Sequence, residues 1–172
     1  MHNRAIWKFL AASALAVVMM APGSIQAQAG GDTVLKPADT LKMLPLSVYY
    51  NGRQAPTQPR NSGGVKFADG LHVLATLVDT SGYSTGVQTK YQAYFIAEAA
   101  LKVGGENLPA GIYGAGFVED KFVLTDVGGH DVLSVNSGED AGMKHPLPLQ
   151  VVADTAGGFR LYAGRKYVSF SR

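Results

Sequence analysis

The sequence predicts an all-β domain, built as a small antiparallel barrel or a barrel-like bent sheet. Short apolar stretches separated by Gly, Pro, Asn and Asp follow one another along most of the chain. Within several of them, apolar residues recur with the period of two that is typical of strands. The 21 glycines among 172 residues favour curved strands, because glycine in a strand often marks a bend or a close approach.

The first 29 residues have the pattern of a secretory signal peptide. Two basic residues precede the apolar run 9–21, and small residues at Ala27 and Ala29 follow it. The run is shorter than the roughly 20 apolar residues that span a bilayer. We therefore expect cleavage after Ala29 or after Ala27, and a mature protein that is periplasmic or secreted and has no membrane span.

The mature chain is expected to begin with a lead-in segment, residues 30–45. Asp39 can cap one turn there, but Pro37 and Pro45 bracket that turn too closely for a longer helix. Residues 46–172 are expected to form one β-domain, held by its core because the chain has no cysteine. The expected strands are 46–50, 65–67, 71–78, 89–97, 99–103, 111–118, 121–127, 132–135, 149–153, 159–163 and 166–170.

The segment 90–103 decides the fold class. Its Ala, Glu, Leu and Lys content favours a helix, yet every odd-numbered position in it is apolar. The period of two predicts one long bent strand, or two strands joined at a bulge near Glu98. Gly104 and Gly105 are expected to end it.

Residues 159–170 form the clearest predicted hairpin, with Gly164 and Arg165 as a two-residue turn. This register pairs Phe159 with Phe170 and places alternate residues on opposite faces. The core face is expected to carry Phe159, Leu161, Val168 and Phe170. The other face is expected to carry Arg160, Tyr162, Tyr167 and Ser169.

A second predicted hairpin turns at Glu119 and Asp120. Its register places Phe117 opposite Phe122, and Ala115 opposite Leu124.

The charge of the chain argues against a nucleic-acid binder. Without the two basic residues of the leader, 13 basic and 13 acidic residues remain, and they form no basic cluster that would displace counterions from phosphates. We expect an exported, non-enzymatic β-domain that binds a small apolar or amphipathic molecule, or an envelope partner. No cofactor is predicted.

Tyrosines and two arginines are the candidate ligand-binding residues. Tyrosine suits a cavity because its body is apolar and its tip polar, although it is also an ordinary sheet residue. Arg60 precedes Gly63 and Gly64 in a stretch, 51–64, that is expected to be irregular and that can be an anion-binding nest or merely a flexible loop. The candidates are Arg60, Tyr83, Tyr94, Tyr113, Arg160, Tyr162 and Tyr167.

Asp126, His130 and Asp131 are the candidate metal ligands. A two-residue hairpin at Gly128 and Gly129 would place Asp126 opposite Asp131, where like charges destabilise the pair. A different loop register, a nearby cation or a divalent metal would relieve this repulsion. A solvated turn with offset carboxylates is the alternative.

Ser84 is the candidate nucleophile of an alternative hydrolase function, because residues 82–86 match the pattern G-x-S-x-G. That motif needs a helix after the serine, whereas residues 87–95 are expected to form a strand. His130 and Asp126 are the only assignable triad partners. The alternative is a Gly/Ser/Thr loop.

An outer-membrane β-barrel is a third possible class, since the mature chain is long enough for eight strands. Membrane strands need ~9–11 residues and aromatic girdles. Most expected strands are shorter, and the single tryptophan lies in the leader.

Residues 101–113, LKVGGENLPAGIY, resemble an x-G-x-x-L-P-A-G-x-Y signature. It is found in small exported β-proteins of uncharacterised function, many from Acidobacteria-like bacteria. Residues 61–67, 78–83 and 111–131 look like the same type of protein. The resemblance implies an exported all-β protein and no particular chemistry.

Overall fold

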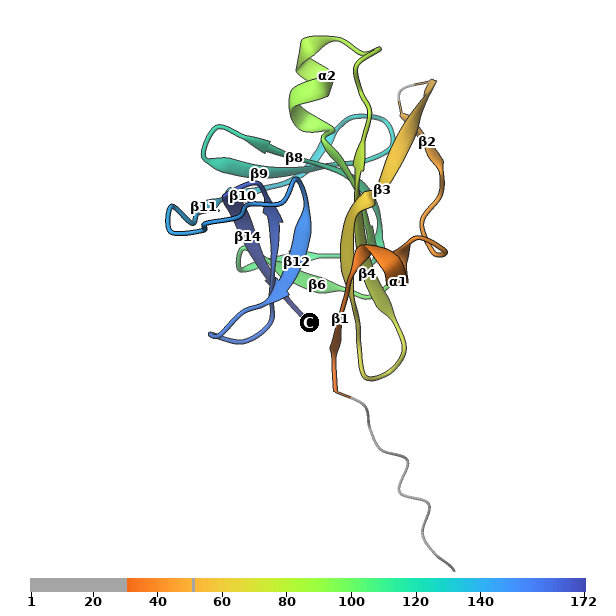
Figure 1. The fold of residues 1–172 in the computed structure, drawn as a ribbon. Helices are drawn as coiled ribbons and strands as arrows, with labels where there is room; N and C mark the ends of the chain where they lie inside the picture. The colour runs from red at the N-terminus through yellow and green to blue at the C-terminus, as the bar shows by residue number, and fades with distance from the viewer. Residues whose placement is uncertain (1–30, 51) are drawn as a thin grey trace, which may run out of the picture.

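A computed structural model describes residues 31–172, apart from residue 51 (Figure 1). The described chain consists mainly of antiparallel strands, which confirms the predicted all-β class. The expected signal peptide, residues 1–29, lies outside the described residues.

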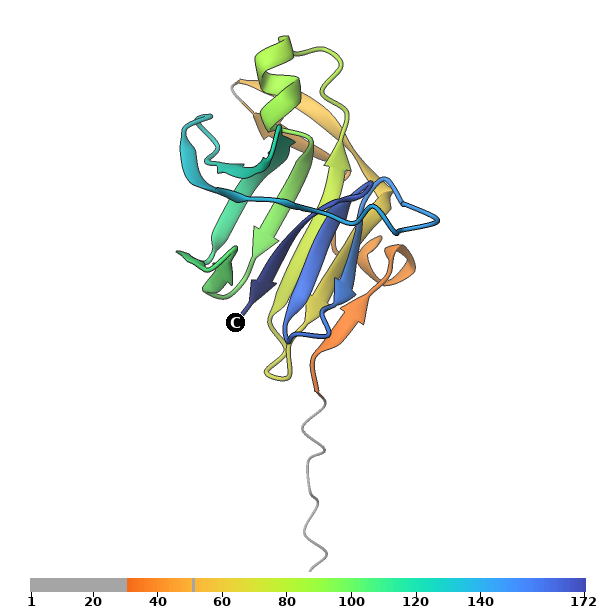
Figure 2. The ribbon, with the colours of Figure 1, turned by 90° about the vertical axis from the view of Figure 1, so that its left-hand side faces the viewer.

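The strands form two sheets that pack face to face and do not close into one barrel (Figure 2). Each pairing is antiparallel. The first sheet contains, in spatial order, β1 (Thr33–Leu35), β3 (Arg53–Lys66), β4 (His72–Val78), β5 (Ala93–Ala97), β8 (Gly111–Val118), β9 (Lys121–Thr125) and β10 (Asp131–Asn136), with β2 (Ser47–Tyr50) also paired to β3. The second sheet contains β12 (Gln150–Ala153), β13 (Phe159–Ala163), β14 (Lys166–Ser171), β6 (Leu101–Val103) and β7 (Glu106–Leu108), with β11 (Gly138–Glu139) also paired to β14.

The segment that decides the fold class contributes one strand to each sheet. Its odd-numbered positions from 91 to 103 are all buried, as the period of two predicts. The chain leaves β5 at Ala97, crosses between the sheets near Glu98, and enters β6 at Leu101. One alternating pattern therefore supplies core side chains to both sheets.

The predicted strand 89–97 is corrected at its beginning. Residues Thr85–Lys90 form the short helix α2, and the strand starts only at Ala93. None of the side chains of α2 is buried. The helix lies at one end of the molecule and contacts β8 (Figure 1).

Both predicted hairpin registers are confirmed. The pairs between β13 and β14 run from Phe159 opposite Phe170 to Ala163 opposite Lys166. Gly164 in the turn has a φ of 61°. β8 and β9 pair Phe117 with Phe122. The four residues predicted for the core face of the C-terminal hairpin are all buried.

The lead-in segment is more structured than the sequence predicts. β1 pairs with β3, and the single-turn helix α1 (Pro37–Thr40) packs on β3. The hydroxyl of Thr40, which is buried, lies 2.7 Å from that of Ser62. The turn starts earlier than predicted: Lys36 precedes α1, and Asp39 lies within the helix, where its Oδ2 accepts a hydrogen bond from the Lys36 amide at 2.9 Å.

The stretch 51–64, expected to be irregular, is also corrected. Most of it belongs to β3, a strand of 14 residues that pairs with β2 at one end and with β4 along the rest. The glycines and prolines of this stretch hide the strand pattern, because both residue types are depleted in strands.

The main core lies between the sheets and is built from aliphatic and phenylalanine side chains. Phe95 from the first sheet meets Phe170 from the second edge to face, with ring centroids 6.4 Å apart. A smaller group, which we call the upper cluster, lies under α2 and the β2–β3 hairpin. Its buried members are Val48, Tyr50, Ala55, Val78 and Tyr91, with Tyr83, Val87 and Tyr94 packed against them.

Candidate ligand-binding groove

An apolar groove of about 440 Å³ lies where an edge of one sheet faces an edge of the other. β1 is the edge strand of the first sheet and β12 that of the second, and the two run side by side (Figure 1). The volume falls within the range of small-molecule sites. The lining residues are Val34, Leu35, Lys36, Pro37, Arg60, Asn61, Ser62 and the continuous segment 147–153.

The two sides of the groove differ in charge. Segment 147–153, which includes β12, carries no charged residue; apart from Gln150, its side chains are those of leucine, proline, valine and alanine. The opposite side, formed by β1, the start of α1 and β3, carries Lys36 and Arg60. No aspartate or glutamate lines the groove.

A bulge in β3 brings Arg60 to the groove. Gln58 pairs with Leu77 and Ser62 with Thr76, so residues 59–61 have no partner in β4. Pro59 fits this position because it lacks the amide hydrogen that a paired residue would donate. Bulges redirect a side chain out of the regular alternation of a strand.

Hydrogen bonds hold the bulge in shape. The Ser62 hydroxyl donates to the Pro59 carbonyl at 2.5 Å, and the Asn61 amide donates to Gln58 Oε1 at 3.0 Å. These polar groups of the groove are thus used within the fold, whereas the Arg60 side chain has no hydrogen-bond partner among the described residues.

The structure fits neither alternative for Gly63 and Gly64, an anion-binding nest or a flexible loop. Both glycines lie in the regular ladder opposite Ala75 and Leu74, and neither has a positive φ. Their role is close packing, because a Cβ on Gly63 would lie 3.0 Å from the Val151 amide nitrogen. Glycine at this position therefore lets β12 approach β3 beside the groove.

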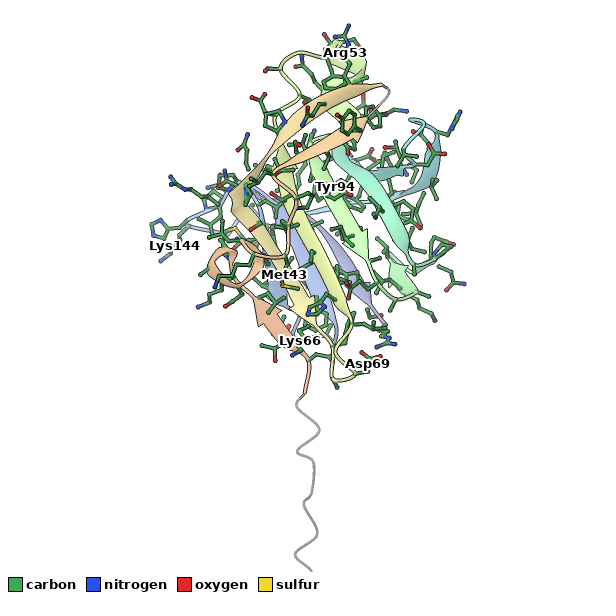
Figure 3. The ribbon with its side chains drawn as sticks, turned by 90° about the vertical axis from the view of Figure 1, so that its right-hand side faces the viewer. Met43, Arg53, Lys66, Asp69, Tyr94 and Lys144 are labelled. Atoms are coloured by element: carbon green, nitrogen blue, oxygen red, sulfur yellow. The ribbon has the colours of Figure 1, made fainter. Side chains whose placement is uncertain are left out.

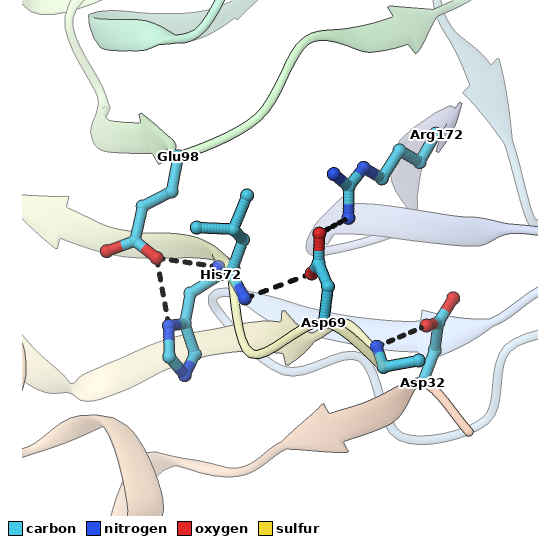
Figure 4. Close-up of polar contacts among 7 residues, drawn as sticks. Asp32, Asp69, His72, Glu98 and Arg172 are labelled. Atoms are coloured by element: carbon cyan, nitrogen blue, oxygen red, sulfur yellow. Dashed lines mark hydrogen bonds and ion pairs between the residues drawn. The ribbon is translucent and has the colours of Figure 1, made fainter. Parts of the chain in front are cut away.

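The cations of the groove have no carboxylate partner in the described chain. Its five ion pairs are His72–Glu98, Lys90–Asp131, His130–Asp126, Arg160–Asp154 and Arg172–Asp69. Figure 4 shows two of these near the β3–β4 turn, where Arg172 Nη1 lies 2.5 Å from Asp69 Oδ2 and His72 Nδ1 lies 2.9 Å from Glu98 Oε2. Neither Arg60 nor Lys36 takes part in any of the five.

The predicted ligand residues of the C-terminal hairpin do not line the groove and make contacts within the fold. Arg160 Nε lies 2.7 Å from Asp154 Oδ2, and its guanidinium carbon lies 4.5 Å from the centroid of the Tyr167 ring. Tyr162 is buried and packs against Tyr167. The segment after β11 crosses this face of the sheet (Figure 2). The hydrogen bond from Arg160 also holds the pKa of Asp154 below its ordinary value.

The other predicted tyrosines lie outside the groove. Tyr83 belongs to the upper cluster and donates its hydroxyl to the Arg53 carbonyl at 2.8 Å. Tyr94 packs on the same cluster, on the face of the first sheet turned away from the second (Figure 3). Tyr113 is buried and donates to the Pro109 carbonyl at 2.9 Å. Arg60 is thus the one predicted ligand residue that lines the groove.

The structure brings two of the three predicted metal ligands together. His130 Nδ1 lies 3.1 Å from Asp126 Oδ2, and hydrogen bonds from the His130 amide and ring lower the pKa of Asp126. Asp131 lies opposite Thr125 at a register shift, and Lys90 Nζ contacts its carboxylate at 2.8 Å. A longer loop and a cation therefore relieve the predicted repulsion. Within residues 31–50 and 52–172, no three His, Cys, Asp or Glu side chains form a metal-binding group.

Ser84 lies at the start of α2, so the strand predicted to follow it is wrong. Its carbonyl accepts hydrogen bonds from the Val87 and Gln88 amides, and its side chain is exposed. The residues described here include no hydrogen bond between Ser84 and His130, whose ring contacts Asp126 instead. The geometry does not assemble the triad that the motif requires.

Tyr91 gives the upper cluster a predicted sensitivity to alkali. Burial, with a smaller contribution from Tyr94, raises the pKa of the Tyr91 hydroxyl far above its ordinary value. An unfolded tyrosine loses its proton near pH 10. Above that pH the unfolded chain releases a proton that the folded chain keeps, so stability falls as pH rises.

We expect Tyr91→Phe to remove this part of the alkaline destabilisation. Between about pH 8 and about pH 11, the free energy of unfolding should fall in both proteins. The fall should be roughly 1.4 kcal/mol larger in the unmodified protein than in the variant. Urea unfolding at both pH values measures the difference. Equal losses in the two proteins would contradict the assignment, because the raised pKa values of Tyr83, Tyr94 and Tyr113 act on both.

The helices in the described ranges are too short to span a membrane. Comparison of the chain with protein-family models, curated proteins and solved structures finds no match.

Proposed function

We propose that this chain is an exported, non-enzymatic binding protein whose groove holds the apolar body of a small amphipathic molecule. The groove of about 440 Å³ between β1 and β12, lined mainly by apolar side chains, carries the proposal. Export is the expectation from residues 1–29.

The exposure of the groove residues supports this use. Leu147 is 51% exposed on the β12 side, and the half-buried Val34 and Leu35 line the groove from β1. Contiguous exposed apolar surface on a soluble protein often marks a binding site.

The size of the groove sets the affinity that we expect. Each buried methylene contributes about 0.8 kcal/mol, so eight methylenes contribute about 6 kcal/mol before the ordering of ligand and protein is subtracted. A dissociation constant of roughly tens of micromolar to one millimolar follows for an alkyl chain of this length, on the order of −4 to −6 kcal/mol.

The proposal predicts that Leu147→Ser weakens binding of a neutral apolar ligand. The fluorescent probe N-phenyl-1-naphthylamine carries no charge at neutral pH and brightens in apolar sites. We expect about fivefold weaker binding, because a half-exposed leucine contributes about 1 kcal/mol to the contact. Titration of the protein with the probe measures the dissociation constant.

Leu46→Ser is the matched control for this experiment. Leu46 is 78% exposed and does not line the groove, so its replacement should leave the dissociation constant unchanged. The proposal fails if the unmodified protein does not bind the probe, or if Leu147→Ser and Leu46→Ser bind it equally well.

A further inference from the structure

We infer that the groove selects anionic amphiphiles, and that Arg60 binds their acidic group. The inference rests on the proposed function, and it names the class of ligand: a molecule with an apolar body and a carboxylate or phosphate at one end.

Charge complementarity is the first argument. Arg60 and Lys36 line the groove, whereas no acidic side chain does, and neither cation belongs to an ion pair among the described residues. The guanidinium of arginine stays charged at every physiological pH and fits a carboxylate or phosphate with two parallel hydrogen bonds. A neutral or cationic head group would leave this charge without a partner.

The placement of the charges gives the ligand a direction. Both cations lie on the β1 and β3 side, and the segment 147–153 opposite them is uncharged. A ligand with its acidic group beside Arg60 can lay its apolar body along Leu147, Leu149 and Val152. The groove thus separates the polar and apolar contacts that an amphipathic molecule needs.

The bulge makes Arg60 better suited to this role than an arginine on a flexible loop. The backbone on both sides of residue 60 is fixed by the β3 pairings and by the hydrogen bond of Ser62 to Pro59. Less backbone freedom is therefore lost when a ligand binds. The other polar side chains of the bulge, Asn61 and Ser62, already have partners within the fold.

The experiment compares ligands that share an alkyl chain and differ in their head group. Decanoate, decyl phosphate and decanol are titrated against the protein with bound N-phenyl-1-naphthylamine, the two anions below their micelle concentrations and decanol below its solubility limit. We expect the two anions to bind about tenfold more tightly than decanol. Arg60→Gln should reduce this preference to about twofold or less and leave decanol binding as it is. Added salt should weaken the preference, because the contact is at the surface.

Lys66→Gln is the control for the loss of one positive charge. Lys66 lies on the same strand, is exposed, and does not line the groove. This variant should keep the full preference for the anions. Far-ultraviolet circular dichroism of both variants confirms that the exposed substitutions leave the fold intact.

The outcomes separate the inference from the function on which it rests. If no alkyl compound displaces the probe, the proposed function itself fails. If decanol binds as tightly as decanoate and decyl phosphate, or if Arg60→Gln keeps the preference, the anion assignment is overturned while the groove function stands. Displacement by an extended apolar peptide alone overturns the assignment to an amphiphile. A preference for either anion, lost in Arg60→Gln, supports it.

Discussion

Gly114→Ala is expected to lower the free energy of unfolding by about 3 kcal/mol. A Cβ at this position would lie 1.9 Å from Tyr91 Cδ2 and 2.6 Å from Thr125 Oγ1. The backbone has little room to yield, because Gly114 pairs with Tyr94 in β5 and with Thr125 in β9. Tyr91 would have to leave its site, where it is 2% exposed and stacks on Tyr50.

Gly86→Ala is the matched control. Gly86 lies in α2, has no positive φ, and has no atom within 4 Å of the added Cβ. Alanine there should stabilise the protein by roughly 0.5–1 kcal/mol, because glycine is the poorer helix former. Urea unfolding of both variants tests the pair. If the free energy of unfolding of Gly114→Ala lies within about 0.5 kcal/mol of that of the unmodified protein, the close packing of Tyr91 against β8 is contradicted.

Phe95→Ala is expected to cost about 3–5 kcal/mol of unfolding free energy. Phe95 is 2% exposed, lies on a central strand of the first sheet, and meets Phe170 of the second sheet. Its removal leaves a cavity between the sheets that neighbours held in two ladders cannot easily fill. Thermal and urea unfolding measure the loss.

Ile112→Ala serves as the comparison for this core substitution. Ile112 lies on the adjacent strand but is 46% exposed, so its truncation should cost less than about 1 kcal/mol. Similar losses for Phe95→Ala and Ile112→Ala would show that the core does not lie between the sheets as described.

The parts of the fold that were predictable depend on local patterns. The alternation through residues 91–103 identifies buried positions without any knowledge of their partners. The hairpin 159–170 has one register that buries Phe159 and Phe170 and leaves Arg160 out of the core, so its pairs follow from the turn.

Other elements were missed because their local signals are weak or point elsewhere. β1, β7 and β11 have two or three residues each, too few for a period to show. α2, with the sequence TGVQTK, has a glycine and two threonines, which are poor helix formers. Tertiary contacts decide the structure of such segments.

The sequence predicts only one of the residues that line the groove. The sequence predicts Arg60 as a ligand-binding residue in a glycine nest or a flexible loop, whereas the structure places it on a bulge of β3. The groove unites segments more than 80 positions apart along the chain, Val34–Pro37 and 147–153, and no local pattern reveals that two sheet edges meet. Likewise, the use of Arg160 within the fold becomes visible only when Asp154 is placed beside it.

The position of β14 limits the order in which the protein can be completed. Among the described strands it comes last in sequence, yet it lies inside the second sheet, between β13 and β6. During synthesis, β6 therefore has no partner on that side until residues 166–171 have been made. Until then β6 is an open edge that must be shielded from pairing with other chains. The second sheet is therefore continuous only once β14 has paired with both β13 and β6.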